Sequence, residues 1–316
     1  MISRIQHFNI AFYAMIMGFW WLTLASLKLE HTFHWDMFIG KSLLFFTCFL
    51  FVIISIFYLL KILYFPIYVK KDFYHPIKSN FFPWIGKIFL ILAIWFLWIS
   101  EYISLILWLA GIIIQFSLTL IIFRRWILEE MDIKILNPLW FLPVVWNMMT
   151  PIAGVPLWFI EISWFFFSIG IMMWGVIFTI LMNRILFHQS LPEKLFPTLT
   201  ILIAPPVIAM IALIVLWGWQ LTELSKILYY FALFLFLLLI TNISTLKRIP
   251  FYMSWWALSF PLAVFTSGTF IMFEKTWQIF FQIFGLSLYI LLVFVMIFLI
   301  YKTIHAMQGK EICIDE

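Results

Sequence analysis

Charged residues are scarce in this sequence of 316 residues, because Lys, Arg, Asp and Glu together make up only 10% of it. Hydrophobic residues make up 66%, so the chain has too few polar groups to cover a water-soluble globule of this size. Cysteine is also scarce: Cys48 lies within an apolar run and Cys313 in the tail, which argues against a disulfide framework. Low-complexity and linker-like segments are absent. We therefore expect a single transmembrane domain over residues 1–316.

Apolar runs of about 20 residues, the length that crosses roughly 30 Å of hydrocarbon, recur along nearly the whole chain. They predict an all-α polytopic membrane protein with ten spans, at about 5–27, 39–65, 79–98, 102–123, 139–157, 158–182, 196–217, 222–246, 251–273 and 276–302. The break between the fifth and sixth spans is marked only by Gly154, Pro156 and Glu161. The first run is too long and too aromatic for a secretory signal, so we expect a retained helix there.

Basic residues are distributed unequally between the two sides of these spans. With ten spans both termini share a side, and that side holds fourteen of the nineteen Lys and Arg residues: Arg4, Lys61, Lys70, Lys71, Lys78, Arg124, Arg125, Lys134, Arg184, Lys194, Lys247, Arg248, Lys302 and Lys310. The opposite side holds Lys28, Lys41, Lys226 and Lys275. Because Lys and Arg in short loops stay cytoplasmic, we predict that both termini face the cytoplasm.

Prolines occur in the odd-numbered spans, whereas the interiors of the even-numbered spans have none. Spans three, five, seven and nine contain or begin with Pro83; Pro138, Pro143, Pro151 and Pro156; Pro197, Pro205 and Pro206; Pro250 and Pro261. The first span has Gly18 at its middle instead. Proline breaks a helix, and a freed carbonyl facing lipid costs several kcal/mol, so broken helices belong inside the protein.

The alternation therefore predicts five helical hairpins, each with a kinked inner helix and a regular outer helix. Five inner helices at roughly 8–10 Å spacing leave a central hole of roughly 2–3.5 Å radius, which admits a small ion. The predicted pore-helix kinks lie at Gly18, Pro83, Pro143, Pro151, Pro205, Pro206 and Pro261. The alternative is that these residues serve packing in a solid bundle.

Carboxylates are missing from the interiors of the spans, where cation pores and proton-coupled carriers usually place them. The only clearly interior ionisable residue is Lys87 in the third span, so a lumen would favour anions. Lys87 either faces the pore or extends its amine to the cytoplasmic interface. Asn147 and Thr150, beside Pro151, either satisfy freed backbone groups or contact a passing ion.

Catalytic and metal-binding patterns are equally sparse. No span pairs a nucleophile with a base or presents two convergent carboxylates, so we do not expect an enzyme. His31 and His34 are three residues apart but have no third ligand nearby, so we expect neither a metal nor a cofactor.

Four segments carry a resemblance to a known family: FYHPIKSNFF (73–82), NPLWFLPVVWNMM (137–149), ILIAPPVIAMIA (201–212) and WWALSFPLAVFTSGT (255–269). Together, and in this order, they resemble the tellurite-resistance/dicarboxylate transporter family. This family includes bacterial TehA-like proteins, fungal malate and sulfite exporters, and the slow-type anion channels of plant guard cells. The resemblance implies a ring of five hairpins around one pore per subunit, subunits gathered as homotrimers, and a bacterial inner (plasma) membrane location.

The resemblance also implies a gate, because the phenylalanine before the proline of the ninth helix occludes the pore in this family. That position is Phe260, followed by Pro261. One feature departs from the family pattern, because Trp146 stands where the guard-cell channels have a small residue. The termini of this sequence are short, so the kinase-controlled tails of the plant proteins cannot be carried over to it. Pro83 and Gly86 also lie too near the inner end of the third span to explain a central bend.

The sequence thus predicts a passive channel for small monovalent anions such as chloride and nitrate, closed at rest by Phe260. The alternative is a secondary exporter of a dicarboxylate, sulfite or a tellurium oxyanion by alternating access. A membrane scaffold without transport activity would leave the proline pattern without a purpose.

Overall fold

This computed structural model describes residues 5–309, which form helices joined by turns and loops and contain no strand. Arg4, Lys310 and Cys313 lie outside these residues. The all-α prediction is confirmed. The chain forms two compact units, of which unit 1 contains residues up to Ser79 and from Lys247 on, and unit 2 contains Asn80–Leu246. The single domain expected from the sequence stays a prediction, and each unit is described separately.

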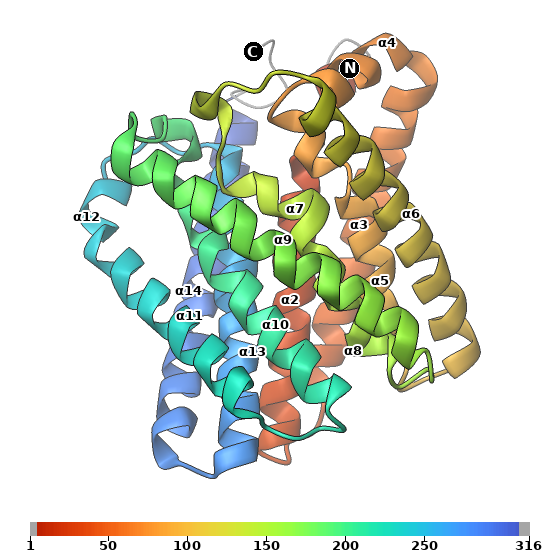
Figure 1. The fold of residues 1–316 in the computed structure, drawn as a ribbon, viewed down its shortest axis with the longest axis vertical. Helices are drawn as coiled ribbons and strands as arrows, with labels where there is room; N and C mark the ends of the chain where they lie inside the picture. The colour runs from red at the N-terminus through yellow and green to blue at the C-terminus, as the bar shows by residue number, and fades with distance from the viewer. Residues whose placement is uncertain (1–4, 310–316) are drawn as a thin grey trace. The chain divides into compact units, whose positions relative to one another are not determined.

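Nine helical segments among residues 5–309 are long and apolar enough to cross a membrane (Figure 1). They are Phe12–Thr32, Phe38–Tyr64, Lys78–Phe96, Glu101–Leu128, Ile160–Phe187, Glu193–Leu216, Glu223–Thr241, Met253–Thr276 and Ile279–Gln308. The predicted count of ten is not confirmed, because residues 138–154 form four short helical pieces instead of one long helix.

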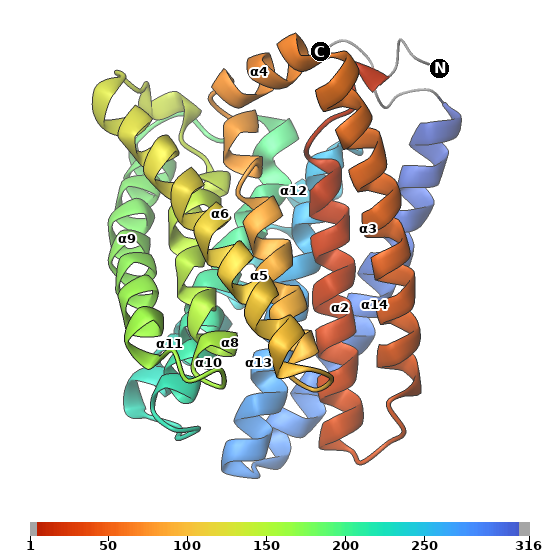
Figure 2. The same ribbon diagram turned by 90° about the vertical axis from the view of Figure 1, so that its right-hand side faces the viewer.

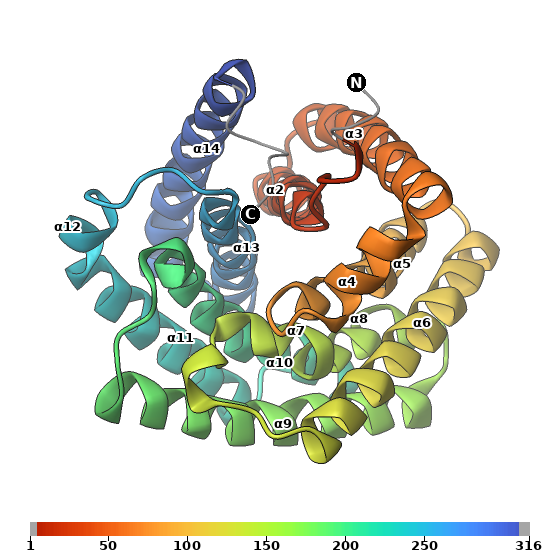
Figure 3. The same ribbon diagram turned by 90° about the horizontal axis from the view of Figure 1, so that it is seen from above.

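Unit 1 consists of two hairpins. Helices α2 (Phe12–Thr32) and α13 (Ser259–Thr276) pack against each other, α3 (Phe38–Tyr64) packs on α2, and α14 (Ile279–Gln308) packs on α13 (Figures 2 and 3). In their most apolar windows, 78% of the α2 residues and 83% of the residues in the α13 span are buried, against 22% for α3 and 28% for α14. The odd-numbered spans are thus the inner ones, as the prolines and Gly18 predicted.

Gly18 does not kink α2, which runs unbroken from Phe12 to Thr32. A β-carbon at Gly18 would lie 2.2 Å from Ser259 Oγ and 2.8 Å from Ser259 Cβ, far inside van der Waals contact. The glycine therefore allows α2 to approach the first turn of α13 closely. Its predicted role as a kink is replaced by a role in packing.

The first span begins seven residues later than predicted. Asn9 Oδ1 accepts a hydrogen bond of 2.9 Å from the backbone N–H of Ala11, a local turn that competes with helix immediately before α2 starts. At its other end α2 extends past Lys28, which pairs with Glu274 of α13. The carboxylate of Glu30 accepts hydrogen bonds from the backbone N–H groups of Ile39 and Gly40 at 2.7 and 2.9 Å. The charged side chains of Lys28 and Glu30, near the C-terminal end of α2, thus both have partners.

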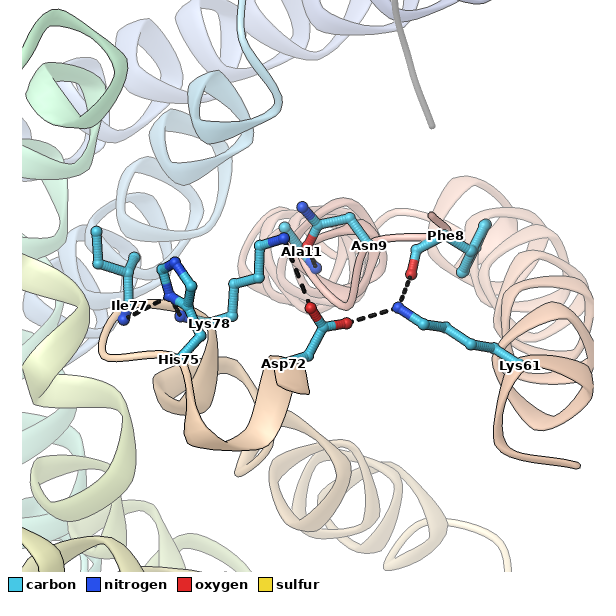
Figure 4. A network of polar contacts seen from close by, with 8 residues as sticks. All are labelled: Phe8, Asn9, Ala11, Lys61, Asp72, His75, Ile77 and Lys78. Atoms are coloured by element: carbon cyan, nitrogen blue, oxygen red, sulfur yellow. Dashed lines mark hydrogen bonds and ion pairs between the residues drawn. The ribbon is translucent and has the colours of Figure 1, made fainter. Parts of the chain in front are cut away.

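A cluster of polar contacts fastens one end of unit 1 (Figure 4). Helix α4 (Pro66–Tyr74) follows α3 directly and carries Asp72. The Asp72 carboxylate lies 2.5 Å from Lys61 Nζ and 3.5 Å from Lys78 Nζ. Lys61 Nζ also donates to the Phe8 carbonyl at 2.8 Å. The contacts thereby join the end of α3, the α4 helix and the segment before α2.

We expect Asp72→Asn to destabilise the protein by about 3–5 kcal/mol, because it leaves the ammonium of Lys61 buried without its carboxylate. Lys61 and Asp72 are both buried. Thermal unfolding in detergent measures the effect. The control is Glu223→Gln, which removes an exposed ion pair with Lys226 at 2.9 Å and should cost about 0–1 kcal/mol. Equal unfolding temperatures for the two variants would contradict the expectation.

Unit 2 contains three hairpins. Its inner segments are α5 (Trp84–Phe96), the run formed by η3 (Pro138–Trp140), α7 (Phe141–Val144), η4 (Val145–Met149) and α8 (Thr150–Gly154), and α10 (Ala204–Leu216). Helix α8 contacts both α5 and α10. The outer helices α6 (Glu101–Leu128), α9 (Ile160–Phe187) and α11 (Glu223–Thr241) pack behind them (Figure 3), with the short α12 (Ile243–Leu246) after α11.

Three inner spans share one construction, a 3₁₀-helix followed by a proline-led α-helix. The pairs are η1 (Lys78–Phe81) with α5, η5 (Glu193–Ile203) with α10, and η6 (Met253–Leu258) with α13. Pro83 immediately precedes α5, Pro205 and Pro206 lie in the first turn of α10, and Pro261 lies in that of α13. The N–H groups in the first turn of an α-helix make no intrahelical hydrogen bond, so a proline there costs the helix no bond. These prolines therefore mark changes of helix type, where the sequence predicted bends within a continuous α-helix.

Candidate functional site

The fifth span of the sequence lies in unit 2 and is broken into η3, α7, η4 and α8. Side chains from the outer helix α6 donate hydrogen bonds to its backbone carbonyls. The carbonyl of Pro143 accepts hydrogen bonds from Gln115 Nε2 at 3.0 Å and from Thr119 Oγ1 at 2.6 Å. Both side chains are buried, and they lie one helical turn apart on the same face of α6. The interruption at Pro143 is thus stabilised from behind, and α7 passes into the 3₁₀-helix η4 without an orphaned carbonyl at this position.

Asn147 and Thr150 have different surroundings. Asn147 Nδ2 donates to the Val144 carbonyl at 2.7 Å and to Thr119 Oγ1 at 3.1 Å, so its amide serves the broken backbone. The carbonyl of Thr150 accepts from Trp108 Nε1 at 3.1 Å. Pro151 lies beside it in the first turn of α8. The Thr150 hydroxyl is buried and has no hydrogen-bond partner among the described residues.

We expect Thr119→Val, which keeps the shape of the side chain, to destabilise the protein by about 1–3 kcal/mol, because it removes bonds to the Pro143 carbonyl and the Asn147 amide. The measurement is the thermal unfolding temperature in detergent. The control is Thr179→Val on α9, an exposed residue whose hydroxyl bonds only to the Gly175 carbonyl at 2.8 Å. A loss no larger than that of the control would show that the Thr119 bonds do not hold the fifth segment.

Lys87 is fully buried in unit 2, so the alternative in which its amine reaches an interface is not the arrangement seen. Its Nζ lies 5.2 Å from the centroid of the Trp84 ring and 5.1 Å from that of Trp146. No described residue forms a hydrogen bond to it. Two cation–π contacts stabilise an ammonium by about 0.5–2 kcal/mol each, whereas burying an unpaired ion costs several kcal/mol. The two tryptophans offset this cost only in part.

The ring of Trp146 covers the Lys87 amine. Trp146 belongs to η4 and Lys87 to α5, so the contact joins two inner segments of unit 2.

Phe260 is the second residue of α13 and is fully buried in unit 1. Its neighbours in the chain hold the backbone in place. Ser259 lies against Gly18, and its Oγ donates to the Trp256 carbonyl at 2.6 Å. Trp256 in turn donates from Nε1 to Thr303 Oγ1 of α14 at 2.9 Å. The start of α13 is thus fixed to both α2 and α14, and the aromatic side chain projects from an anchored turn.

The predicted residues fall into two groups. Gly18, Phe260 and Pro261 lie together at the contact of α2 with α13 in unit 1. In unit 2, the Lys87 ammonium lies over the ring of Trp146, which directly precedes Asn147. Among the remaining proline positions, Pro143 lies within α7. The others stand at helix starts, namely Pro83, Pro151, Pro205 and Pro206.

Sequence reasoning missed Gln115 and Thr119, because they lie on an outer span without prolines. The available signal was two polar side chains spaced i, i+4 in an otherwise apolar helix. Within residues 5–309, no three His, Cys, Asp or Glu residues are grouped so that they could hold a metal ion.

Comparison with known proteins gives matches over most of the chain. Residues 7–304 match the family model described as voltage-dependent anion channel. The chain is 31% identical over 246 residues to the S-type anion channel SLAH3 of Arabidopsis thaliana, an alignment that covers 77% of this chain and 38% of that protein. It is 28% identical over 255 residues to the guard cell S-type anion channel SLAC1 of the same plant, covering 79% of this chain and 46% of that protein.

An archaeal protein matches over its whole length. The chain is 26% identical over 351 aligned positions to the uncharacterized transporter MJ0762 of Methanocaldococcus jannaschii, with 99% of each chain covered. By contrast, the chain spans only about two-fifths to one-half of the length of the plant channels it matches.

Proposed function

The chain belongs to the voltage-dependent anion channel family, and from this premise we propose that it conducts small monovalent anions, chloride and nitrate, passively across a membrane. The resemblance indicated by the four sequence segments is confirmed at the level of the family. The chain is a multi-pass membrane protein, and its family consists of channels and transporters. The choice of anions is the part that we propose.

The observation that carries the proposal is the charge of the inner spans. In residues 5–309 the only ionisable side chain in the middle of an inner span is Lys87, and it is fully buried. The carboxylates on the inner spans, Glu30, Glu193 and Glu274, lie in first or last turns. A dehydrated cation needs a compensating negative charge along its path. An interior with one lysine and no carboxylate favours anions instead.

The path that we propose is lined by the five odd-numbered spans of the sequence, with Phe260 as the gate. The high burial of four of these spans supports an inner position for them. We further propose a homotrimer in the plasma membrane with both termini cytoplasmic, on the basis of the family resemblance and of the basic residues. Lys and Arg predominate in the loops on the side of the termini.

Single-channel recording of the purified protein in planar bilayers tests this function. A channel gives discrete current steps, and its reversal potential follows the chloride gradient. It retains those steps when nitrate replaces chloride and loses them when gluconate replaces chloride. Currents that follow the potassium gradient would contradict anion selectivity.

A secondary exporter of dicarboxylate, sulfite or tellurium oxyanions is the second candidate, favoured by the full-length similarity to an archaeal protein named as a transporter. It predicts saturable, proton-coupled flux in proteoliposomes without resolvable current steps. The lack of a carboxylate relay in the inner spans favours the channel, because proton-coupled carriers use such groups at membrane depth.

A further inference from the structure

We propose that Lys87 forms a binding site for one small inorganic anion inside unit 2, walled by the rings of Trp84 and Trp146. The site rests on the proposed function, since it names a position at which the conducted chloride or nitrate is held. It is distinct from the proposed gate at Phe260, which belongs to unit 1.

Lys87 has no carboxylate partner among the described residues. Unit 2 contains seven carboxylates, all exposed: Glu101, Glu129, Glu130, Asp132, Glu161, Glu193 and Glu223. Lys87 is fully buried, and none of the ion pairs formed by the described residues includes it. The described residues therefore supply no ion pair to a side chain that they enclose completely.

The amine of Lys87 also has unused hydrogen-bonding capacity. A lysine ammonium has three N–H donors, and no described residue accepts from Lys87 Nζ. By contrast, the buried Lys61 of unit 1 has two partners, since its Nζ donates to Asp72 and to the Phe8 carbonyl. The N–H donors of Lys87 thus stay open to a bound ligand.

Two tryptophan rings form the walls of the site, with their centroids 5.1 and 5.2 Å from Lys87 Nζ. Their π faces attract a cation at this position but carry no net negative charge. A protonated Lys87 therefore needs an anion as its counter-charge. A halide or nitrate supplies one negative charge and accepts N–H donors, which are the two things that Lys87 does not receive from the described residues.

The test measures anion binding and conduction separately in the purified full-length protein. In wild type, replacing gluconate by nitrate or chloride at constant ionic strength should raise the unfolding temperature. Lys87→Met and Lys87→Gln should abolish this shift, whereas Lys87→Arg, which keeps the charge, should retain it in part. The control Lys226→Met, which alters an exposed lysine of unit 2, should respond to the anions as wild type does.

Conduction provides the second readout. The chloride concentration that half-saturates the current should rise by about ten-fold in Lys87→Met and Lys87→Gln, because a fixed charge that concentrates the anion is gone. A wild-type unfolding temperature that does not respond to these anions, together with an unchanged half-saturating concentration, would overturn the site. Anion-dependent stabilisation that needs Lys87, in a protein that passes no anion current, would support the site and overturn the channel.

Discussion

Replacing Phe260 by alanine is expected to raise the chloride current on the order of ten-fold, which corresponds to about 1.4 kcal/mol off the barrier to conduction. An aromatic ring in an apolar constriction blocks an ion both by its volume and by excluding water. Phe260 is fully buried, and the adjacent Ser259 is held against Gly18. Truncation of the side chain should therefore open the path while the backbone that carries it stays in place.

Current in oocytes or planar bilayers, normalised to the amount of protein in the membrane, measures this effect. The matched control is Phe265→Ala. Phe265 is equally buried and lies further along the same helix, where its ring packs on Phe284 of α14 at a centroid distance of 5.9 Å. Its loss should destabilise the packing of α13 on α14 without raising the current. Unchanged current in Phe260→Ala, or an equal rise in both variants, would remove Phe260 from the role of gate.

Introducing leucine at Gly170 is expected to destabilise the protein by more than about 3 kcal/mol, at the upper end for overpacking. A β-carbon at this position of α9 would lie 2.7 Å from both the backbone nitrogen of Met148 and the carbonyl oxygen of Val145. These are backbone atoms of η4 and cannot rotate away as a side chain could. The outer helix would have to move off the broken inner segment that it supports.

Gly175 is the control for this substitution, because it lies on the same helix and a β-carbon there meets nothing within 4 Å. Gly175→Leu should be neutral or stabilising by up to about 1 kcal/mol, through helix propensity alone. Thermal unfolding in detergent and the monodisperse yield of the two variants distinguish them. Comparable behaviour of the two leucine variants would show that the close contact between α9 and η4 is not required.

The inner position of the odd-numbered spans could be predicted because its physical cause is written in the residue types. A proline within an apolar run interrupts the α-helix, and interrupted backbone is costly against lipid, so Pro143, Pro205 and Pro261 point to inner segments whatever their neighbours are. The side chains that satisfy such a break could not be predicted, since Gln115 and Thr119 lie more than 20 residues from Pro143 and are brought to it only by packing.

The local form of the inner spans was not predictable either. A proline in an apolar run is compatible with a kink in one helix and with the start of a new one, and hydropathy does not distinguish them. The structure resolves this in favour of a new start at Pro205, because residues Glu193–Ile203 wind as a 3₁₀-helix. The enclosure of Lys87 likewise depends on Trp146, about 60 residues away in the chain, which no local pattern reveals.

The seventh span changes helix type along its length, from the 3₁₀-helix η5 to the α-helix α10. A 3₁₀-helix rises about 2.0 Å per residue and an α-helix about 1.5 Å, and η5 contains 11 residues. Rewinding it into an α-helix would shorten it by about 5.5 Å and turn each residue back by about 20° relative to its neighbour. Such a change would alter the length of the span and rotate the side chains of η5 relative to one another, whereas α10 would keep its form.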